Sequence, residues 1–174
     1  MAEHVEVMLS EQEVDRRIQE IGEQISRDYE GKQVHLVCVL KGGSFFLCEL
    51  AKRITVPVNI DFMKVSSYGG GTVSSGQVSI KMDVSESIAG KDVLIVEDII
   101  DSGNTLNLLP KILMERGPKS IRLCALLDKP DRREVDVKMN YVGFRIPDKF
   151  VVGYGLDYDQ RYRNLPYIGE VVFD

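Results

Sequence analysis

The sequence predicts an α/β fold in which a mainly parallel sheet carries helices on both faces. Short apolar runs recur at residues 34–40, 93–96 and 120–127, and runs of this length are typical of strands buried on both faces. Segments with helical spacing separate these runs, as the crossovers between parallel strands require. The 174 residues contain no internal repeat or linker, so we expect a single domain over residues 1–174.

The first predicted unit is a helix, a strand, a turn and a second helix. Ser10 and Glu13 have the spacing of a capping box at a helix start. The strand at 34–40 ends in the turn 41–44, and residues 45–54 have the composition of a helix. Apolar residues extend the first helix at helical spacing, namely Val14, Ile18, Ile21, Ile25 and Tyr29.

The middle of the chain predicts a pair of strands joined by a long loop. Residues 58–67 alternate between apolar and polar residues as a strand does, and residues 78–84 supply a strand that can pair with them. The segment between them is rich in Gly and Ser and too long for a tight hairpin. We therefore expect an exposed loop there.

The second half predicts another alternating unit and then short strands. Residues 92–98 predict a buried strand, which a helix near Thr105 and the strand 120–127 follow. Pro110 lies within that helix and predicts a kink or a later start. The last third predicts three short strands, at 141–144, 150–155 and 167–172.

Composition and charge exclude several classes of protein. The formal net charge of −5 disfavours a nucleic-acid coat, which needs a basic face. No apolar run approaches the roughly 18 residues of a membrane span, and the first residues lack the apolar core of a signal peptide. We therefore expect a cytoplasmic protein with no membrane or nucleic-acid partner, in which Cys38, Cys48 and Cys124 are buried, reduced thiols.

Two acids directly after a buried strand are the most unusual feature of the chain. Glu97 and Asp98 end the stretch that begins at Val93, and carboxylates are rarely buried without a partner. A short loop leads from them into a helix, and its small residues leave backbone N–H groups free to bind an anion. The loop consists of Asp101, Ser102, Gly103, Asn104 and Thr105. It lacks the glycine and lysine spacing of a P-loop or a dinucleotide fingerprint.

A phosphorylated sugar with a divalent cation satisfies both halves of this pattern. Ribose hydroxyls can donate to Glu97 and Asp98, and Mg²⁺ can bridge carboxylate, hydroxyl and phosphate oxygens. The alternative is that Asp101 or Ser102 merely caps the helix while the two acids are solvated. The direct sequence of strand, acids and anion loop favours the ligand site.

The stretch VLIVEDIIDSGNTL, residues 93–106, resembles the phosphoribosyl pyrophosphate motif of type I phosphoribosyltransferases, in particular the hypoxanthine-guanine branch. The resemblance extends in the expected order to LKGGSFF, SSYGGG, LLDKP and IPDKFVVGYGLDYDQRYRNLPYIGEV, and so covers nearly the whole chain. It implies the fold of that family, with a small hood built from the terminal segments.

The resemblance also implies an activity, a cofactor and partners. The expected enzyme is a purine salvage transferase, which moves 5-phosphoribosyl from phosphoribosyl pyrophosphate to hypoxanthine and guanine. The products are IMP or GMP and pyrophosphate, and the cofactor is Mg²⁺. The family further implies a homo-oligomer, either a dimer or a tetramer.

The resemblance assigns the acids and the anion loop to the phosphoribosyl donor. Glu97 and Asp98 would meet the ribose hydroxyls, directly or through Mg²⁺, and residues 101–105 would hold the 5′-phosphate. Asp101 would also act as general base near a purine ring nitrogen. Asn104 departs from several relatives, which have a basic residue there, so phosphate affinity would depend more on backbone donors and Mg²⁺.

The resemblance assigns a second group of residues to the purine. Lys129 would donate to the 6-oxo group, which adenine lacks. Phe150 would stack on the base and Val151 would offer backbone groups to its edge. Asp157 would border the purine and bind a second Mg²⁺. Without the resemblance, a lysine before a Pro turn fits a surface position equally well.

The remaining assignments concern pyrophosphate and water. Lys41 and Gly42 would cradle pyrophosphate through backbone N–H groups, and Arg163 would bind it through its planar fork. Whether the peptide between Lys41 and Gly42 is cis stays open. Residues 67–77 would form a lid, with Ser67 and Tyr68 as its contacts, or else a mobile loop without a role.

Three other functions compete with this hypothesis. A nucleotide-binding regulator of RNA or DNA would need a basic face or an added domain, and a phosphoribosyltransferase for xanthine would differ only around the purine 2-position. A Ser-His-Asp enzyme or metal hydrolase is disfavoured by the histidines. His4 lies in the N-terminal segment, which we expect to be loose. His35 lies within a strand pattern that favours a core position.

Overall fold

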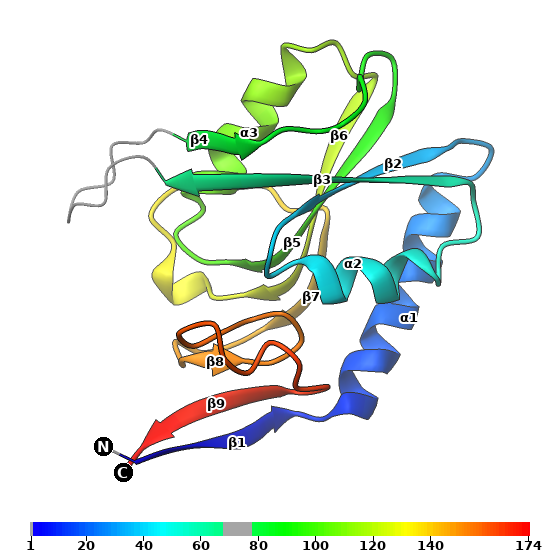
Figure 1. Ribbon diagram of the computed structural model, residues 1–174. Coiled ribbons are helices and arrows are strands. Elements are labelled where there is room, and N and C mark those ends of the chain that lie inside the picture. The colour runs from blue at the N-terminus through cyan, green and yellow to red at the C-terminus, as the bar shows by residue number, and fades with distance from the viewer. Residues whose placement is uncertain (1, 68–77) are drawn as a thin grey trace.

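The computed structural model describes residues 2–67 and 78–174. Its helices and strands form two sheets, a large one and a small one (Figure 1). The helices are α1 (Glu11–Asp28), α2 (Ser44–Ala51) and α3 (Asn104–Met114), with a short 3-10 helix at Pro130–Arg132. The strands are β1 (Glu3–Leu9), β2 (Val34–Val39), β3 (Val58–Ser67), β4 (Val78–Met82), β5 (Asp92–Ile100), β6 (Ser120–Asp128), β7 (Tyr141–Arg145), β8 (Val151–Val152) and β9 (Ile168–Phe173).

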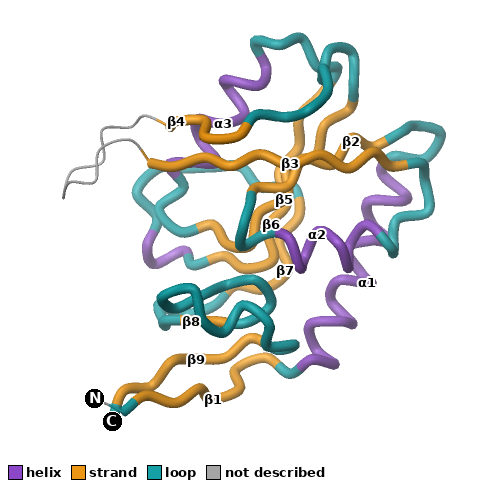
Figure 2. The backbone as a smooth tube through the Cα atoms, viewed as in Figure 1, coloured by secondary structure: helices purple, strands orange, loops and turns teal. Residues whose placement is uncertain are grey.

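The large sheet has the strand order β4-β3-β2-β5-β6-β7. Its strands β3, β2, β5, β6 and β7 run parallel, and β4 pairs antiparallel with β3 at one edge. Helices cover both faces, α1 and α2 on one side and α3 on the other (Figure 2). The predicted α/β fold with a mainly parallel sheet is therefore confirmed.

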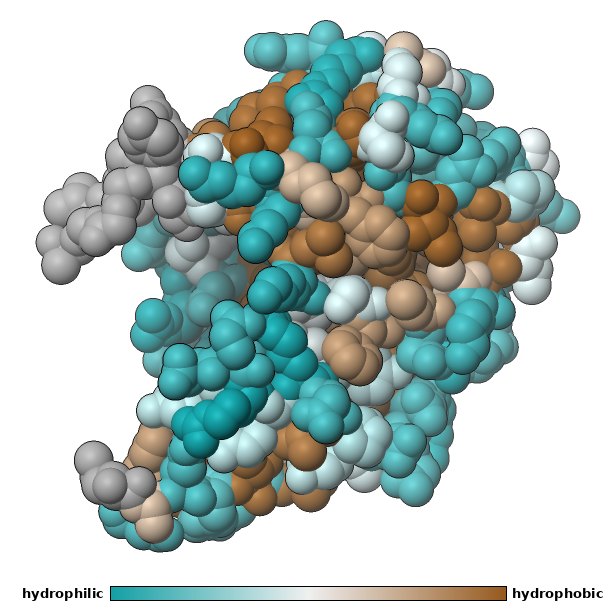
Figure 3. Space-filling model, viewed as in Figure 1, coloured by the Kyte–Doolittle hydropathy of each residue, from teal (hydrophilic) through white to brown (hydrophobic). Residues whose placement is uncertain are grey.

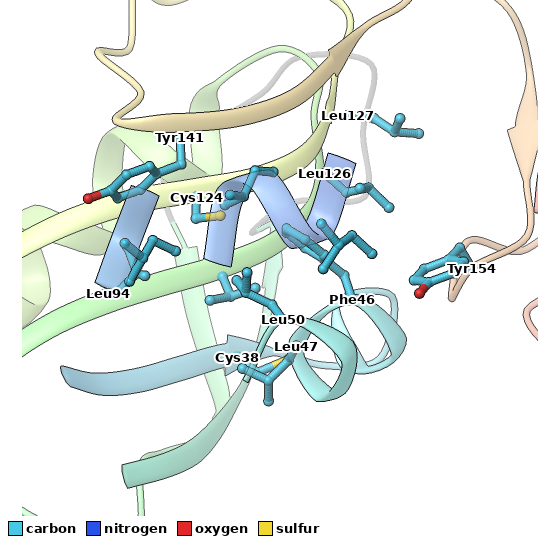
Figure 4. Close-up of a cluster of buried hydrophobic side chains, with 14 of the residues drawn as sticks. Cys38, Phe46, Leu47, Leu50, Leu94, Cys124, Leu126, Leu127, Tyr141 and Tyr154 are labelled. Atoms are coloured by element: carbon cyan, nitrogen blue, oxygen red, sulfur yellow. The ribbon is translucent and has the colours of Figure 1, made fainter. Parts of the chain in front are cut away.

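The face under α1 and α2 holds the larger core cluster (Figure 4). The predicted capping box starts α1, because the Ser10 hydroxyl accepts from the Glu13 N–H at 3.1 Å and the Ser10 N–H donates to the Glu13 carboxylate at 3.2 Å. Such a cap stabilises a helix by about 1 kcal/mol. The apolar stripe of α1 then packs on even-numbered residues of the central strands, such as Leu36 and Leu94.

The opposite face buries the apolar side of α3. Leu106, Leu109 and Leu113 pack there with Val93 and Ile95. Odd-numbered and even-numbered residues of β5 thus point to opposite faces, as the strand geometry requires. α3 begins at Asn104 and continues through Pro110 to Met114, so the predicted later start is wrong.

The small sheet has the order β1-β9-β8 and joins the two ends of the chain. Asp174 N–H donates to the carbonyl of Ala2 at 3.0 Å, and the termini lie side by side below the large sheet (Figure 1). This sheet is the expected hood. The expected loose N-terminus is wrong, because His4 lies in β1 and pairs with Val172.

Two further expectations need correction. The strand predicted at 150–155 is only two residues long, since Gly153, Tyr154 and Gly155 have positive φ angles of 95°, 51° and 100° that bend the chain out of the sheet. Cys48 is exposed, because it lies on the outer side of α2, whereas Cys38 and Cys124 are buried as expected. In the part of the chain that the structure describes, no helix is long and apolar enough to cross a membrane.

Candidate active site

The candidate site lies where parallel strands of the large sheet end. The segments that follow β2, β5 and β6 begin at Leu40, Asp101 and Lys129, and the carboxyl ends of neighbouring parallel strands share one edge. The hood adds residues 153–163 to this edge, since a Cβ atom on Gly155 would collide with the carbonyl oxygen of Gly42.

The loop between β5 and α3 encloses a small cavity of about 90 Å³. Gly103 turns the chain with φ +90°, and a Cβ there would lie 2.7 Å from the carbonyl oxygen of Val135. Among the described residues, the backbone N–H groups of Ser102, Gly103 and Thr105 have no hydrogen-bond acceptor. Because a water molecule occupies about 30 Å³, this cavity has room for a phosphate group beside a helix N-terminus.

The two acids of β5 point to opposite faces of the strand. Glu97 lines the loop cavity with Ser102 and Gly103, whereas a Cβ on Gly42 would collide with the Asp98 carboxylate on the other face. Burial raises the pKa of Glu97 well above its usual range, and the neighbouring Asp98 raises it further. Burial also raises the pKa of Asp98 to about 6, although backbone N–H groups and Arg163 oppose the shift. In the described part of the chain, Asp98 accepts from the Ile99 N–H at 2.7 Å, Glu97 has no hydrogen-bond donor, and neither carboxylate has an ion-pair partner. The burial of Glu97 is therefore uncompensated, and that of Asp98 is compensated only in part.

Asp101 lies at the start of the loop with an unsatisfied acceptor. Its Oδ1 atom is buried and has no hydrogen-bond donor in the described part of the chain. The Nε atom of Arg132 is the cation nearest to Oδ1 and lies 3.8 Å away, too far for a hydrogen bond. Asp101 Oδ1 is therefore available to accept a proton from a ligand bound at this position.

Arg133 and Asp128 support the loop and were not singled out by the sequence. The Arg133 Nε–H donates to the carbonyl of Asp101 at 3.1 Å, and its guanidinium also donates to the buried Asp128 carboxylate. Glu134 and Val135 N–H groups bond the carbonyl of Ser102 at 2.9 and 3.1 Å. The sequence feature that could have indicated this pair is Asp128, because this acid directly follows an apolar run, as Glu97 does.

Lys129 is a buried lysine whose ammonium has no partner within the described ranges. It is 9% exposed, and its N–H donates to the carbonyl of Ile100 at 3.0 Å, which fixes it beside the end of β5. Its ammonium has no acceptor among residues 2–67 and 78–174. An unpaired ammonium in such a place favours a ligand oxygen.

The hood contributes an aromatic side chain and a buried backbone edge. Phe150 is 49% exposed, and its ring meets the edge of Tyr158 with centroids 5.3 Å apart. Val151 is buried in β8, where it pairs with Glu170. An exposed ring is available for stacking on a planar ligand.

The turn after β2 meets a cluster of polar residues from the hood. The peptide between Leu40 and Lys41 is cis. Lys41 Nζ donates to Gln160 Oε1 at 3.4 Å, and Arg163 donates to the same atom at 3.1 Å. Arg163 Nη2 also lies 3.4 Å from Asp157 Oδ1. The structure thus brings Lys41, Asp157 and Arg163 together, as one anion-binding corner requires.

The acids can hold a hard cation only with help from a ligand. In the described ranges, no three His, Cys, Asp or Glu side chains are grouped so as to hold a metal ion. The pair Glu97 and Asp98, and separately Asp157, offer the oxygen ligands that Mg²⁺ prefers, and Mg²⁺ commonly completes its shell with substrate phosphates and water. The donor set therefore fits a cation that binds together with its substrate. Of the expected lid, Ser67 ends β3, and Tyr68 lies outside the described residues.

The comparisons place this fold, with its candidate anion-binding loop and its hood, in a class of transferases. The model of the family described as "Phosphoribosyl transferase domain" matches residues 4–159. The chain therefore belongs to the phosphoribosyltransferase family.

Full-length relatives define the group within the family. The chain is 55% identical to a hypoxanthine phosphoribosyltransferase of Salmonella typhimurium over 99% of its own length and 98% of that protein. A crystal structure of a hypoxanthine phosphoribosyltransferase from Staphylococcus aureus matches with a TM-score of 0.92 and 50% identity, over 96% of this chain and 91% of that one. A hypoxanthine-guanine phosphoribosyltransferase from Bacillus anthracis matches with a TM-score of 0.93 and 42% identity, over 99% of this chain and 100% of that one. The chain is thus a member of the hypoxanthine phosphoribosyltransferase group.

Proposed function

We propose that this enzyme transfers 5-phosphoribosyl from phosphoribosyl pyrophosphate to hypoxanthine and to guanine, which yields IMP or GMP and pyrophosphate. One observation carries the proposal. A phosphate-sized cavity of about 90 Å³ lies against Glu97, an uncompensated acid that a ribose with its cation would satisfy. The names of the full-length relatives support the same substrates.

The donor occupies the loop and the acids in this proposal. Backbone N–H groups of Asp101 to Thr105 bind the 5′-phosphate, and the α3 N-terminus reinforces them. Glu97 and Asp98 accept from the ribose hydroxyls and hold Mg²⁺. Bound Mg²⁺ supplies positive charge that neutralises donor oxygens. Arg133 keeps the loop in place through the Asp101 carbonyl.

The purine lies between the ends of β5 and β6 and the hood. Lys129 donates to its 6-oxo group, Phe150 stacks on its face, and Val151 presents backbone groups to its edge. Asp157 borders the purine site. The unpartnered Oδ1 of Asp101 accepts the ring proton that leaves as the bond from nitrogen to C1 of the ribose forms.

Pyrophosphate leaves toward the turn after β2. Backbone N–H groups of Lys41 and Gly42 and the guanidinium of Arg163 receive it, and Asp157 holds the second Mg²⁺ there. Positive charge develops on the ribose as the bond to pyrophosphate breaks, so water must be excluded. Residues 67–77, with Ser67 and Tyr68 as contacts, close the site as a lid.

The same proposal extends to the whole protein. Residues 1–174 act as one domain in the cytoplasm, without a membrane or nucleic-acid partner. Apolar side chains gather over β3 and α2 (Figure 3), and the exposed large apolar residues of these elements include Ile60 and Phe45. Exposed apolar patches mark interaction surfaces, which supports a homo-oligomer, either a dimer or a tetramer.

Product formation tests the proposed substrates. The protein is incubated with phosphoribosyl pyrophosphate, Mg²⁺ and, separately, hypoxanthine, guanine, xanthine or adenine, and nucleotide and pyrophosphate are quantified. We expect both products with hypoxanthine and guanine and none with adenine. Donor binding without product from any base would contradict the transfer reaction, and product from xanthine alone would contradict the proposed bases.

A further inference from the structure

A second cavity lies at the opposite end of the large sheet from the active site. Its volume is about 370 Å³, and its lining includes His35 near the start of β2 and Asp92 at the start of β5. His35 and Lys41 are six positions apart, mostly along the extended strand β2, which corresponds to about 20 Å. The cavity is therefore distinct from the site that receives the phosphoribosyl donor.

Positive charge gathers at this cavity, although the chain as a whole carries a formal net charge of −5. Three lysines line it, Lys32, Lys91 and Lys119, and Asp92 is the one acid among the lining residues. Asp92 already accepts from the Ser120 hydroxyl at 2.7 Å. In the described part of the chain, Lys32 and Lys119 have no ion-pair partner, and Lys91 meets only an exposed Glu86 at 3.7 Å. A surface ion pair of this kind contributes little.

A buried histidine without a hydrogen bond faces the same cavity. His35 is 2% exposed, and neither Nδ1 nor Nε2 has a partner among the described residues. Buried polar groups are nearly always hydrogen-bonded, so two unsatisfied ring nitrogens call for an unseen partner. His35 is one of the residues that line the cavity, so its side chain lies next to any molecule bound there.

Neutral polar groups of the lining suit the remainder of a small ligand. Gln33 Nε2 donates to Asn59 Oδ1 at 2.7 Å, which leaves the amide N–H groups of Asn59 for a further acceptor. The volume is at the lower end of the range for small-molecule sites, about 300–1,000 Å³. It exceeds what a free phosphate ion needs.

We propose that this cavity binds a small phosphate-bearing molecule, whose phosphate is held by Lys32, Lys91 and Lys119 beside His35. Ammonium groups bind phosphate as point charges from several directions. Nothing in the transfer reaction uses this site, so the proposal stands apart from the proposed function.

The histidine ring itself provides a local reporter. The chain has two histidines, and the other one, His4, lies in β1 of the hood. Full-length protein with isotope-labelled histidine is titrated with inorganic phosphate or with AMP at constant ionic strength, while both imidazole signals are followed by NMR. We expect the His35 signals to shift to saturation and the His4 signals to remain unchanged.

Matched variants assign the response to the cavity. The double substitution K91Q/K119Q weakens phosphate-induced shifts of His35 about tenfold, because it removes two of three cationic partners. Lys111→Gln, at an exposed position of α3, leaves them unchanged. Arg163→Gln, in the active site, also leaves the His35 response intact, which separates the cavity from phosphate bound at the active site.

The two probes distinguish the sources of phosphate. Tighter binding of AMP than of inorganic phosphate supports a phosphorylated metabolite as the ligand. Equal binding of the two supports free phosphate as the ligand, and in both cases the same lysines hold the phosphate. A His35 signal that moves with neither probe would overturn the proposal. So would a saturable shift of equal strength in K91Q/K119Q.

Discussion

Asp98 shows how a single residue links burial to function. Burial raises its pKa from an ordinary 3.8 to about 6, so the folded protein holds this proton more tightly than the unfolded chain does. The free energy of unfolding therefore falls as the pH rises from about 4 to about 6 and stays low above that. An ionised Asp98 is the form that a cation and ribose hydroxyls would require.

Asp98→Asn should stabilise the protein without substrate at pH 8 by on the order of 2 kcal/mol, because it removes a carboxylate whose burial is compensated only in part. The difference should vanish near pH 4. Urea unfolding across this pH range measures it, with the exposed Asp136→Asn as control. A variant that is less stable than the parent at pH 8 would contradict the incomplete compensation of this burial.

Lys129 carries the proposed choice of base. Lys129→Ala should lower kcat/KM for hypoxanthine by roughly 10- to 100-fold, because a charge-assisted hydrogen bond to the 6-oxo group is lost. Activity with adenine should fall less, so that discrimination narrows. Steady-state kinetics with both bases measure the ratio, and Lys111→Ala is the control. An unchanged ratio would remove Lys129 from base selection.

At the scale of elements, the loop between β5 and α3 depends on the segment that follows β6. Ser102 receives two backbone hydrogen bonds from Glu134 and Val135, and Arg133 binds the carbonyl of Asp101. The side chain of Asn104 also donates to the Glu134 carboxylate at 3.0 Å. The anion loop is thus held by a second loop that lies about 30 residues further along the chain.

Two glycines with similar backbone conformations test this support. Gly103 and Gly117 have φ angles of +90° and +77°, but a Cβ would meet the Val135 carbonyl only at Gly103, and nothing within 4 Å at Gly117. Both substitutions to Ala should cost about 1 kcal/mol of stability or more through the left-handed conformation. Only Gly103→Ala should also weaken donor binding, measured by calorimetry. Equal donor affinities in the two variants would contradict the role of the loop.

Elements with local signals were predictable, and elements that depend on distant pairing were not. The capping box and stripe of α1 lie within one segment, and the apolar runs of β2 and β5 need no partner to be recognised. β1 is polar at alternate positions and exists because β9 pairs with it. β8 ends after Val152 because positive φ angles follow, which apolar composition does not reveal.

The residues of the candidate site likewise divide into those that the sequence indicates and those that only the fold brings together. Asp101, Lys129 and the acids of β5 stand out because polar residues directly follow buried strands. Arg133 does not, since a charged residue in a loop is usually solvated, and its contacts to Asp128 and Asp101 arise only from the fold. Glu97 and Asp98 point to opposite faces of the sheet because both lie within β5, where successive side chains alternate in direction.

At the scale of the whole molecule, the two ends of the chain close over the sheet. β1 and β9 pair along most of their length, and Arg161 binds Glu3 at 2.7 Å within the same hood. The hood brings Phe150, Asp157 and Arg163 to loops whose residues lie far earlier in the sequence. The proposed reaction needs both parts, because the donor would bind the sheet edge while the purine and pyrophosphate would also meet the hood.

The effect of Asp101→Asn on binding and on rate tests the proposed transfer most directly. Asparagine keeps the shape of the side chain but cannot take up the purine proton, so kcat should fall by about 10² to 10⁴, while the dissociation constant of phosphoribosyl pyrophosphate should change by no more than about threefold. The exposed Asp136→Asn should change neither quantity. A kcat close to that of the parent, or donor binding weakened as much as the rate, would contradict the role of Asp101 as general base.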